Sequence, residues 1–539
     1  MQTPLQDLRD AVDRAAASLG AEPKAPPTLE RPKQADHGDY ATNAALLLAG
    51  ALKAKPRDVA ERLASAVQGE LGTALERVDV AGPGFLNLVL TDGWYAAALA
   101  DVLDSGDAYG AGTAEPRLRV NVEFVSANPT GPVHVGHARN AAFGDAVARI
   151  LAHVGHDVFR EFYVNDFGTQ VLRLGESVQA RARGEEVPEG GYRGDYVREL
   201  AERIPGAASA PVEEVAQQAV ALMVDLNRRS LEAFRVTFDR WFSERSLHEP
   251  RPGGGPSPVQ HGFDVLAEQG RSYRHEGALW LRTTEFGDDK DRVIERASGD
   301  HTYFASDIAY HQDKRERGFD LLLDVWGADH HGYVDRMHAA FEALGGRPDG
   351  LELLIMQFVK LAGGGSMSKR AGEFVTLDEL VADIGVDAAR WFLLQRSHET
   401  TIELDLDLAK SQSSDNPVYY VQYAHARIAA ILRKAAAEGA AAPSAELPAT
   451  QSLHPSERAL VKALLAFPAE LAEAADRRAP HRVATYVLDL AQTFTAFYRD
   501  CQVVGAGEAE AFRVALCVAS RQVLARGLDL LGVSAPDEM

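Results

Sequence analysis

A strand, a turn, a helix and a second strand follow one another in residues 118–164, and this order restricts the fold more than any other feature of the chain. Apolar and polar residues alternate from 118 to 124, which is the period of a strand. A turn at Asn128–Pro132 leads into a helix expected at about 136–153, and the second strand is expected at 158–164. The segment therefore predicts half of a doubly wound α/β fold, in which ligands bind beyond the carboxyl ends of the strands.

The same strand and helix pattern returns later in the chain and indicates the domain organisation. Two buried strands are expected at Leu321–Gly327 and Leu351–Leu361. Alternation around a Gly-Pro-Gly turn at Val78–Leu90 predicts a small α+β unit, and from about residue 400 the pattern is helical. We therefore expect an N-terminal α+β domain, an α/β domain with an insertion, and an all-α domain, at residues 1–112, 113–400 with the insertion at about 181–262, and 401–539.

Composition and charge limit the compartment and the partners. The chain contains no apolar run close to the roughly 20 residues that cross a bilayer, and its first residues do not resemble a signal peptide. The two cysteines, Cys501 and Cys517, are too few for a four-cysteine zinc site. We expect a cytoplasmic protein with no membrane partner, no tightly bound metal and no organic cofactor. The net charge of −22 requires any contact with nucleic acid to use a confined basic surface.

His134-Val135-Gly136-His137 lies where the first strand of the βαβ unit turns into its helix. A helix N-terminus offers N–H groups and the positive end of the helix dipole, which favour phosphate. The two histidines, three apart, face the same way near a helix start, and Gly136 leaves room for a flat base. The same four letters recur at His153–His156, at the end of the helix, where Gly155 is expected to cap it. The first copy is therefore the candidate ATP site.

A glycine-rich segment follows the last predicted strand, at Gly363–Gly365, and leads into Ser366–Arg370. Glycines permit a loop to move, and Lys369 and Arg370 supply positive charge. Such a loop is suited to closing over the β- and γ-phosphates of a nucleotide. The sequence contains no Gly-x-x-x-x-Gly-Lys-Ser/Thr, which excludes a P-loop.

Together, these two motifs resemble the HIGH and KMSKS signatures of class I aminoacyl-tRNA synthetases. The rest of the sequence resembles the arginyl-tRNA synthetase family over essentially the whole chain, most specifically at His37–Asn43, Val122–Pro132, Gly327–Tyr333 and Ser411–Arg427. One position departs from the KMSKS pattern, because Ser366 stands where the first lysine is expected. The candidate cations for that role are Lys360, Arg119 and Arg370.

The resemblance implies both a fold and a reaction in protein synthesis. The fold is a doubly wound, Rossmann-like class I synthetase catalytic domain, with an N-terminal α+β tRNA-binding domain and a C-terminal helical bundle that reads the anticodon. The reaction joins L-arginine to ATP as arginyl-adenylate, releases pyrophosphate, and then esterifies the 3′-terminal adenosine of tRNA(Arg). The resemblance further implies that arginine activation waits for bound tRNA. ATP is expected to arrive with Mg²⁺, held mainly by the phosphates, and a monomer is expected.

The resemblance also assigns residues to the substrates. A guanidinium requires carboxylates in a fixed geometry, and Tyr303 and Asp307, four apart, share one helix face. The residues implied for catalysis are His134, His137 and Lys369. Those implied for ATP binding are His134, Gly136, His137, Asp329, His330, Met367, Ser368 and Lys369. Those implied for arginine binding are Glu123, Ser126, Asn128, His137, Tyr303, Asp307 and His331.

Aromatic and basic residues mix at the start of the helical C-terminal third, and unpaired bases stack on aromatic rings. The candidates for tRNA contact are Tyr419, Tyr420, Tyr423 and Arg427. Several assignments keep a structural alternative at this point. Glu123 also suits a buried ion pair, Tyr303 also suits simple packing, and the three tyrosines also suit a helical core.

Other functions remain as alternatives. A glutamyl-type class I synthetase shares a Pro-Thr-Gly turn before its HxGH sequence, but the acidic Glu123 and Asp307 favour a cationic substrate. A cysteinyl-type synthetase requires zinc-binding cysteines in its catalytic domain, and this sequence has none there. A small nucleotidyltransferase leaves the helical C-terminal third unexplained, and loss of His134, His137 or Lys369 would indicate a non-catalytic tRNA-binding paralogue.

Overall fold

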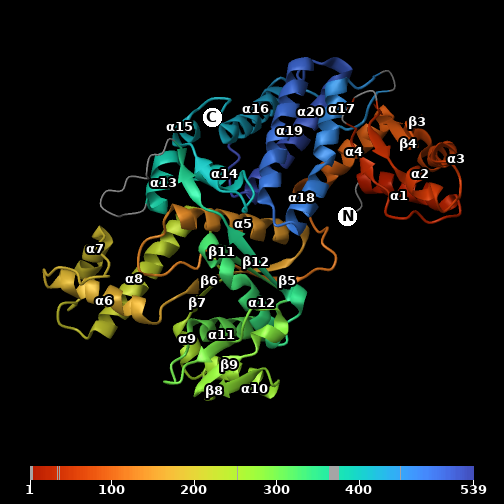
Figure 1. The fold of residues 1–539 in the computed structure, drawn as a ribbon. Coiled ribbons are helices and arrows are strands. Elements are labelled where there is room, and N and C mark those ends of the chain that lie inside the picture. Colours follow the sequence, from red (N-terminus) through yellow and green to blue (C-terminus); the bar gives the residue numbers. More distant parts are fainter. Residues whose placement is uncertain (1–3, 33, 35–36, 252, 363–374, 449–450) are drawn as a thin grey trace.

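The computed structural model describes residues 4–32, 34, 37–251, 253–362, 375–448 and 451–539 (Figure 1). An α+β part at the N-terminal end of the chain packs beside long helices from its C-terminal end, and a central sheet lies below both (Figure 1). One continuous apolar core joins these three regions. Other buried apolar residues of the described chain form three smaller clusters.

The central sheet has five strands in the order β12-β11-β5-β6-β7, and every neighbouring pair is parallel. The first strand in sequence, β5, lies in the middle of the sheet. Strands β6 and β7 follow on one side of it, and β11 and β12 are added later on the other side. The direction reverses between β5 and β11, which makes this edge the topological switch point of a doubly wound fold. The predicted fold class is confirmed. The strands are β5 (Arg119–Glu123), β6 (Asp157–Val164), β7 (Arg240–Ser243), β11 (Leu321–Gly327) and β12 (Leu351–Met356).

Helix α5 (Val135–Val154) connects β5 to β6 and lies between the sheet and the C-terminal helices (Figure 1). It packs so closely on the end of β5 that a Cβ at Gly144 would lie 2.2 Å from the Phe124 ring. Gly155 ends the helix with a φ of +113°, in the left-handed region. The second copy of the HxGH letters, His153–His156, therefore lies at the helix C-terminus as predicted.

The predicted strand at Leu351–Leu361 is wrong in one respect, because the structure divides it into two strands in different sheets. After β12 the chain bends at Gln357, and β13 (Val359–Leu361) pairs instead with β14 (Ile402–Leu404). The Arg139 guanidinium, buried on α5, donates to the carbonyls of Gln357 (2.7 Å) and Ser397 (2.9 Å). These bonds hold the bend against the helix.

Strand β7 falls inside the segment 181–262, which the sequence suggested to be an insertion. It pairs with β6 and is the edge strand of the central sheet. Three helices before it do stand away from the sheet around their own apolar cluster (Figure 1). These helices are α6 (Thr169–Ala182), α7 (Asp195–Arg203) and α8 (Val212–Ala233).

A smaller antiparallel sheet and four helices lie beyond β7 and β11 (Figure 1). Helix α11 carries the candidate residues Tyr303 and Asp307 in its first two turns. The elements are α9 (Arg245–His248), α10 (Pro258–Glu268), β8 (Ser272–His275), β9 (Ala278–Leu281), β10 (Arg292–Glu295), α11 (Tyr303–Glu316) and α12 (Val334–Ala343).

The N-terminal part is a four-stranded antiparallel sheet with helices on its face, and it contains the hairpin predicted at Val78–Leu90. It packs on α17 through the ion pair of Asp92 with Arg458 (2.8 Å) and that of Asp39 with Lys462 (2.5 Å). Its elements are α1 (Pro4–Ser18), β1 (Leu29–Glu30), β2 (Tyr40–Thr42), α2 (Ala44–Ala49), α3 (Pro56–Leu71), β3 (Leu75–Ala81), β4 (Phe85–Leu90) and α4 (Asp92–Ser105).

The described chain after β14 is helical, as predicted, and several of its helices contact α5 directly. Two further helices, α13 and α14, lie between β13 and β14 in sequence and also contact α5. The helices are α13 (Leu377–Ile384), α14 (Val386–Leu394), α15 (Leu406–Lys410), α16 (Pro417–Ala437), α17 (Pro455–Leu465), α18 (Phe467–Asp476), α19 (Pro480–Asp500) and α20 (Glu510–Leu530).

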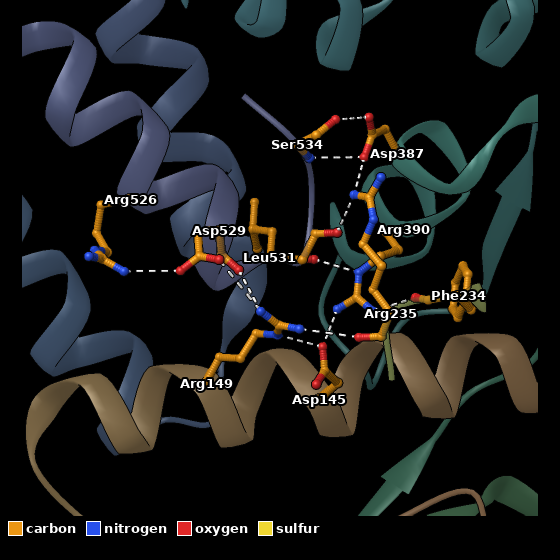
Figure 2. A network of polar contacts seen from close by, with 11 residues as sticks. Asp145, Arg149, Phe234, Arg235, Asp387, Arg390, Arg526, Asp529, Leu531 and Ser534 are labelled. Atoms are coloured by element: carbon orange, nitrogen blue, oxygen red, sulfur yellow. Dashed lines mark hydrogen bonds and ion pairs between the residues drawn. The ribbon is translucent and has the colours of Figure 1, made fainter. Parts of the chain in front are cut away.

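A buried arginine on α14 joins four segments that are far apart in sequence (Figure 2). Arg390 is 0% exposed and donates to Asp145 Oδ2 on α5 (2.5 Å), to the Phe234 carbonyl after α8 (3.0 Å) and to the Leu531 carbonyl after α20 (2.8 Å). Arg149 shares the same Asp145 oxygen at 2.7 Å. The middle of α5 is therefore held by a charge network that reaches the last helix.

Candidate active site

Two histidine rings stack at the N-terminus of α5, at the carboxyl edge of the central sheet. The centroids of His134 and His137 are 3.7 Å apart. The Gly136 N–H donates to His134 Nδ1 (3.1 Å), and the His134 N–H donates to His137 Nδ1 (3.4 Å). A neutral imidazole that accepts at Nδ1 carries its hydrogen at Nε2. Each ring is therefore fixed as a donor through Nε2–H.

Both rings are uncharged at neutral pH. Burial, together with a smaller contribution from the neighbouring His134, lowers the pKa of His137 to about 3. Burial also lowers the pKa of His134. The pair can donate hydrogen bonds to an anion at a helix N-terminus without titrating near pH 7. A Cβ at Gly136 would lie 3.0 Å from Cε1 of the His134 ring, so a larger residue there would crowd the histidine.

The described chain resumes at Val375, beside these histidines. The Val135 N–H donates to the Val375 carbonyl (3.1 Å), the Leu377 N–H donates to the Val133 carbonyl (2.8 Å), and His134 forms a β-bridge with Thr376. The predicted ATP residues Met367, Ser368 and Lys369, and the candidate Arg370, lie outside the described residues. The nearest described residue after them in sequence is thus hydrogen-bonded to the HxGH segment.

Arg119 is the wrong residue to replace the missing first lysine of the KMSKS pattern. It begins β5, whereas the histidines follow the other end of that strand. Its backbone N–H donates to Asp320 (2.8 Å) and its guanidinium donates to the Arg317 carbonyl (2.6 Å), both at the amino edge of the sheet. Lys360, the second candidate, is exposed on β13 shortly before the undescribed segment.

The backbone after β5 is held in a rare conformation by one asparagine. Val125 and Ser126 have φ values of +69° and +39°, and a β-branched residue such as valine strongly disfavours that region. Asn140, on the second turn of α5, accepts from the Val125 N–H (2.6 Å) and donates to the Val325 carbonyl on β11 (2.9 Å). This side chain fixes the ends of β5 and β11 to the helix that carries the histidines.

Glu123 lies at the end of β5 in a buried ion pair, the structural alternative that the sequence left open. Its Oε2 accepts from Lys314 Nζ (2.6 Å), and its Oε1 accepts from the Ser126 hydroxyl (2.9 Å). Lys314, on α11, is 0% exposed and also donates to Asp324 on β11 (2.8 Å). Burial raises the pKa of Glu123, and Lys314 opposes that shift.

A histidine also contacts this cluster. His311 Nδ1 lies 2.8 Å from the Asp307 carbonyl, and its Nε2 lies 2.9 Å from Asp324 Oδ2. The pKa of Asp324 falls to about 2, because Lys314 and His311 overcome the effect of its burial. Lys314 therefore pairs with both Glu123 and Asp324, and Asp324 has His311 as a second partner.

Asp307 is different, because no cation in the described chain pairs with it. It is partly exposed on α11, and its Oδ2 accepts from the Tyr333 hydroxyl (2.7 Å). Burial raises the pKa of Asp307, and the Tyr333 hydrogen bond lowers it. Tyr303, one turn earlier, is 69% exposed and is not a packing residue. A carboxylate and a phenol thus stand on one helix face, open to a cationic ligand.

The other predicted substrate residues lie on exposed turns at the same edge. Asp329, His330 and His331 follow β11 in a 3₁₀ turn, with His330 Nε2 3.5 Å from Asp329 Oδ2. Asn128 is exposed after β5, donates to Gln170 (3.1 Å) and accepts from Asn165 (3.1 Å).

Within the described ranges, no group of three or more His, Cys, Asp or Glu side chains is arranged to hold a metal ion. No helix among the described residues combines the length and apolar character needed to span a membrane.

Three of the predicted tRNA residues form a row on α16, beside Tyr498 of α19. The Tyr419 and Tyr423 rings stack with centroids 6.1 Å apart, and the Arg427 guanidinium lies 4.7 Å from the Tyr423 ring and 5.7 Å from that of Tyr498. Tyr423 and Tyr498 are each 42% exposed. Tyr420 instead turns inward and donates to Thr495 (3.1 Å), which makes it a packing residue.

Sequence reasoning missed the residues that support the site rather than face it. Lys314 and Asn140 fix Glu123 and the turn after it, and Tyr333 orients Asp307. One signal was available for Lys314. It follows Asp307 by seven residues, which places both on one face of a helix.

Comparisons with known proteins agree with this geometry. Three family models match: "Arginyl tRNA synthetase N terminal domain" at residues 6–90, "tRNA synthetases class I (R), catalytic domain" at 98–187 and 255–426, and "DALR anticodon binding domain" at 421–539. The arginine–tRNA ligase of Frankia alni is 47% identical, over 99% of each chain. The Thermus thermophilus arginyl-tRNA synthetase structure is 25% identical over 99% of each chain, with a TM-score of 0.76. A putative arginyl-tRNA synthetase from Campylobacter jejuni is 33% identical, with a TM-score of 0.76, over 84% of this chain and all of its own.

Proposed function

The chain belongs to the arginyl-tRNA synthetase family, and on that premise we propose how its residues divide the work of arginine–tRNA charging. It is an arginine–tRNA ligase. It activates L-arginine with ATP to arginyl-adenylate and pyrophosphate, then esterifies the 3′-terminal adenosine of tRNA(Arg). One observation carries the assignment of the site. The neutral histidine pair and Asp307, which has no paired cation among the described residues, lie at the carboxyl edge of the same sheet, on both sides of its switch point.

The histidines face the anionic substrate. His134 and His137 donate from Nε2–H to the phosphates of ATP and to the charge that grows on the α-phosphate during adenylate formation. Asp329 and His330, in the turn after β11, bind the nucleotide with them. The family resemblance adds Met367, Ser368 and Lys369 over the β- and γ-phosphates, with Lys360 or Arg370 in the role of the missing lysine. Mg²⁺ would be held mainly by the phosphates.

The acidic helix face binds the amino acid. Asp307 and Tyr303 contact the guanidinium, and Glu123, already neutralised by Lys314, forms the wall of the pocket. The backbone end of arginine is held by Ser126, Asn128, His137 and His331. A substrate without matching donors leaves buried acceptors unpaired, which lets such a pocket discriminate strongly.

The partly exposed row of Tyr419, Tyr423 and Arg427 binds the anticodon loop of tRNA(Arg) by stacking, and Tyr420 supports it from inside. The N-terminal part contacts the tRNA elsewhere. We place the protein in the cytoplasm, where tRNA charging supplies translation, and propose that one chain suffices for activity. The domains are proposed at 1–112, 113–400 and 401–539.

The first test is amino-acid-dependent exchange of pyrophosphate into ATP, with each of the twenty amino acids, in the presence and absence of total tRNA. Exchange with arginine alone, and only with tRNA present, is expected. Exchange with a different amino acid overturns the assigned substrate. Absence of exchange and of charging under every condition overturns the catalytic assignment.

His137→Ala is expected to lower the rate of adenylate formation by about 10²- to 10³-fold, because one preorganised donor to the phosphate is removed. The matched control is His156→Ala, the same letter in the second HxGH copy at the C-terminal end of α5. Single-turnover formation of arginyl-adenylate measures both. Because the pKa of His137 is about 3, the wild-type rate should show no titration of this residue between pH 6 and 8. Equal losses in the two variants would contradict its role.

A further inference from the structure

The turn that follows β5 is held in a strained conformation. Val125 has a φ of +69°, and the Ser126 N–H donates to the Phe124 carbonyl two residues earlier (3.0 Å). A hydrogen bond of this kind across a single residue of positive φ belongs to the rarer, strained form of the γ-turn. A β-branched residue pays free energy for such a conformation, so the surrounding fold must hold it in place.

The residues on both sides of Val125 are fixed by other elements. Phe124 is 0% exposed, and its ring closes off the space at Gly144 of α5, where a Cβ would lie 2.2 Å from it. The Ser126 hydroxyl accepts from the Tyr163 N–H on β6 (3.1 Å). The chain must therefore pass between two fixed residues at Val125, and the turn has little freedom to share its strain with its neighbours.

Asn140 is the side chain that meets the strained peptide. It is 7% exposed on the second turn of α5, and its Oδ1 accepts from the Val125 N–H at 2.6 Å. Its amide group donates to the Val325 carbonyl on β11 (2.9 Å), just beyond the point where the pairing of β5 with β11 ends. Both ends of the amide are therefore used, and removal of the side chain takes the acceptor from a buried N–H.

The conformation of Val125 sets the direction of the chain that follows it. Ser126, whose own φ is +39°, and Asn128 come directly after the turn, and both are proposed to hold the backbone end of arginine. A Val125 relaxed to an ordinary negative φ turns the following peptide away from its present direction. The arginine contacts are thus in place only while the strained turn is kept.

We propose that Asn140 is a positioning residue for arginine, and that its hydrogen bond to the Val125 N–H keeps the turn in the conformation that presents Ser126 and Asn128 to the substrate. The proposal rests on the proposed assignment of those two residues to arginine. Without Asn140 the turn relaxes, and bound arginine must restore it. The apparent affinity for arginine then falls with the fraction of molecules that keep the turn, while the rate at saturating arginine is retained.

The test is Asn140→Ala, assayed by tRNA-dependent exchange of pyrophosphate into ATP with arginine and ATP varied in turn at saturating tRNA. The KM for arginine is expected to rise roughly 10- to 100-fold, the range that corresponds to one strained residue of this kind. The KM for ATP and kcat should each change by less than about threefold, because only arginine binding depends on the turn.

The matched control is Asn416→Ala. Asn416 is 3% exposed before α16, and its amide donates to two backbone carbonyls, those of Ala409 (3.1 Å) and Ser411 (2.9 Å). Its loss removes a comparable set of buried hydrogen bonds outside the arginine turn. Asn416→Ala should therefore lower the melting temperature in the same way as Asn140→Ala and leave the arginine KM at the wild-type value.

A second substitution separates positioning from general damage. Val125→Gly in the Asn140→Ala background should return the arginine KM to within about fivefold of the wild type, because glycine adopts a positive φ about as readily as a negative one. The same substitution removes a buried isopropyl group, so the melting temperature falls further rather than recovering. A merely structural role for Asn140 does not give a rescue of KM without a rescue of stability.

An unchanged arginine KM in Asn140→Ala overturns the proposal, and so does a raised KM that Val125→Gly leaves unrescued. If Asn140→Ala does not fold, Asn140→Gln decides, because it keeps the amide and shifts it by one methylene. A raised arginine KM that Val125→Gly restores supports the proposal, and wild-type kinetics overturn it. Failure of the wild type to activate or charge arginine would instead refute the proposed function itself.

Discussion

Replacing Asp307 with asparagine is expected to lower kcat/KM for arginine by roughly 10³-fold, with less than about a threefold change in the KM for ATP. Asp307 has no cationic partner within the described residues, and a guanidinium that enters the site pairs with it away from bulk water. Asparagine keeps the shape and removes the charge, so the guanidinium stays desolvated and unpaired. Asp307→Ala should lose at least as much.

Tyr333→Phe is the matched control for this result. It removes the hydroxyl that donates to Asp307 Oδ2 at 2.7 Å but leaves the carboxylate in place. An increase of only about tenfold in the arginine KM is expected, the size of one hydrogen bond to a charged group. Steady-state charging with arginine and ATP varied in turn gives both constants. Parallel losses for arginine and ATP in Asp307→Asn would remove Asp307 from the amino-acid pocket.

Arg390→Met is expected to destabilise the protein by about 3–5 kcal/mol, the cost of removing one partner of a buried ion pair. The guanidinium is fully buried, and its loss leaves Asp145 with Arg149 as its only cation within the described ranges (Figure 2). The carbonyls of Phe234 and Leu531 lose their donor in the same change. Methionine fills a similar volume, so the effect reports charge and hydrogen bonding rather than a cavity.

The control is Arg149→Met, which removes a cation from the same Asp145 oxygen. The Arg149 side chain is 27% exposed, so water replaces much of its interaction, and a loss of about 1 kcal/mol or less is expected. Urea unfolding followed by circular dichroism, together with the temperature at which charging activity is lost, compares the two variants. If Arg390→Met is no less stable than Arg149→Met, the buried network is not what holds the middle of α5.

The sequence was sufficient to predict the elements whose apolar pattern extends over many residues. Helix α5 and β11 lie within a residue of their predicted positions, and the β3–β4 hairpin begins three residues before its predicted start and ends where predicted. Strand β7 was missed because it has four residues, too few to establish a period beside the helices before it. The division of the strand at Gln357 was missed because its contacts, such as that with Arg139, come from residues distant in sequence.

Some residues of the candidate site could likewise be predicted from the sequence, and others could not. The HxGH segment and the pair Tyr303 and Asp307 could be predicted from local spacing and from resemblance, and the structure places them at one edge of the sheet. The ion pair of Glu123 with Lys314 joins residues 191 positions apart. No local pattern shows that contact, and only the fold decides which charges of the pocket are already neutralised.

The bonds of Arg390 also fix an order of events during synthesis of the chain. Its acceptor at Leu531 is translated 141 residues later, after the whole catalytic sheet and most of the helical domain. A nascent chain that has reached α14 carries a cation with Asp145 and Phe234 available and its third acceptor absent. The support of α5 is therefore completed only when α20 has been made, which ties the maturation of the catalytic region to translation of the far end of the anticodon-binding region.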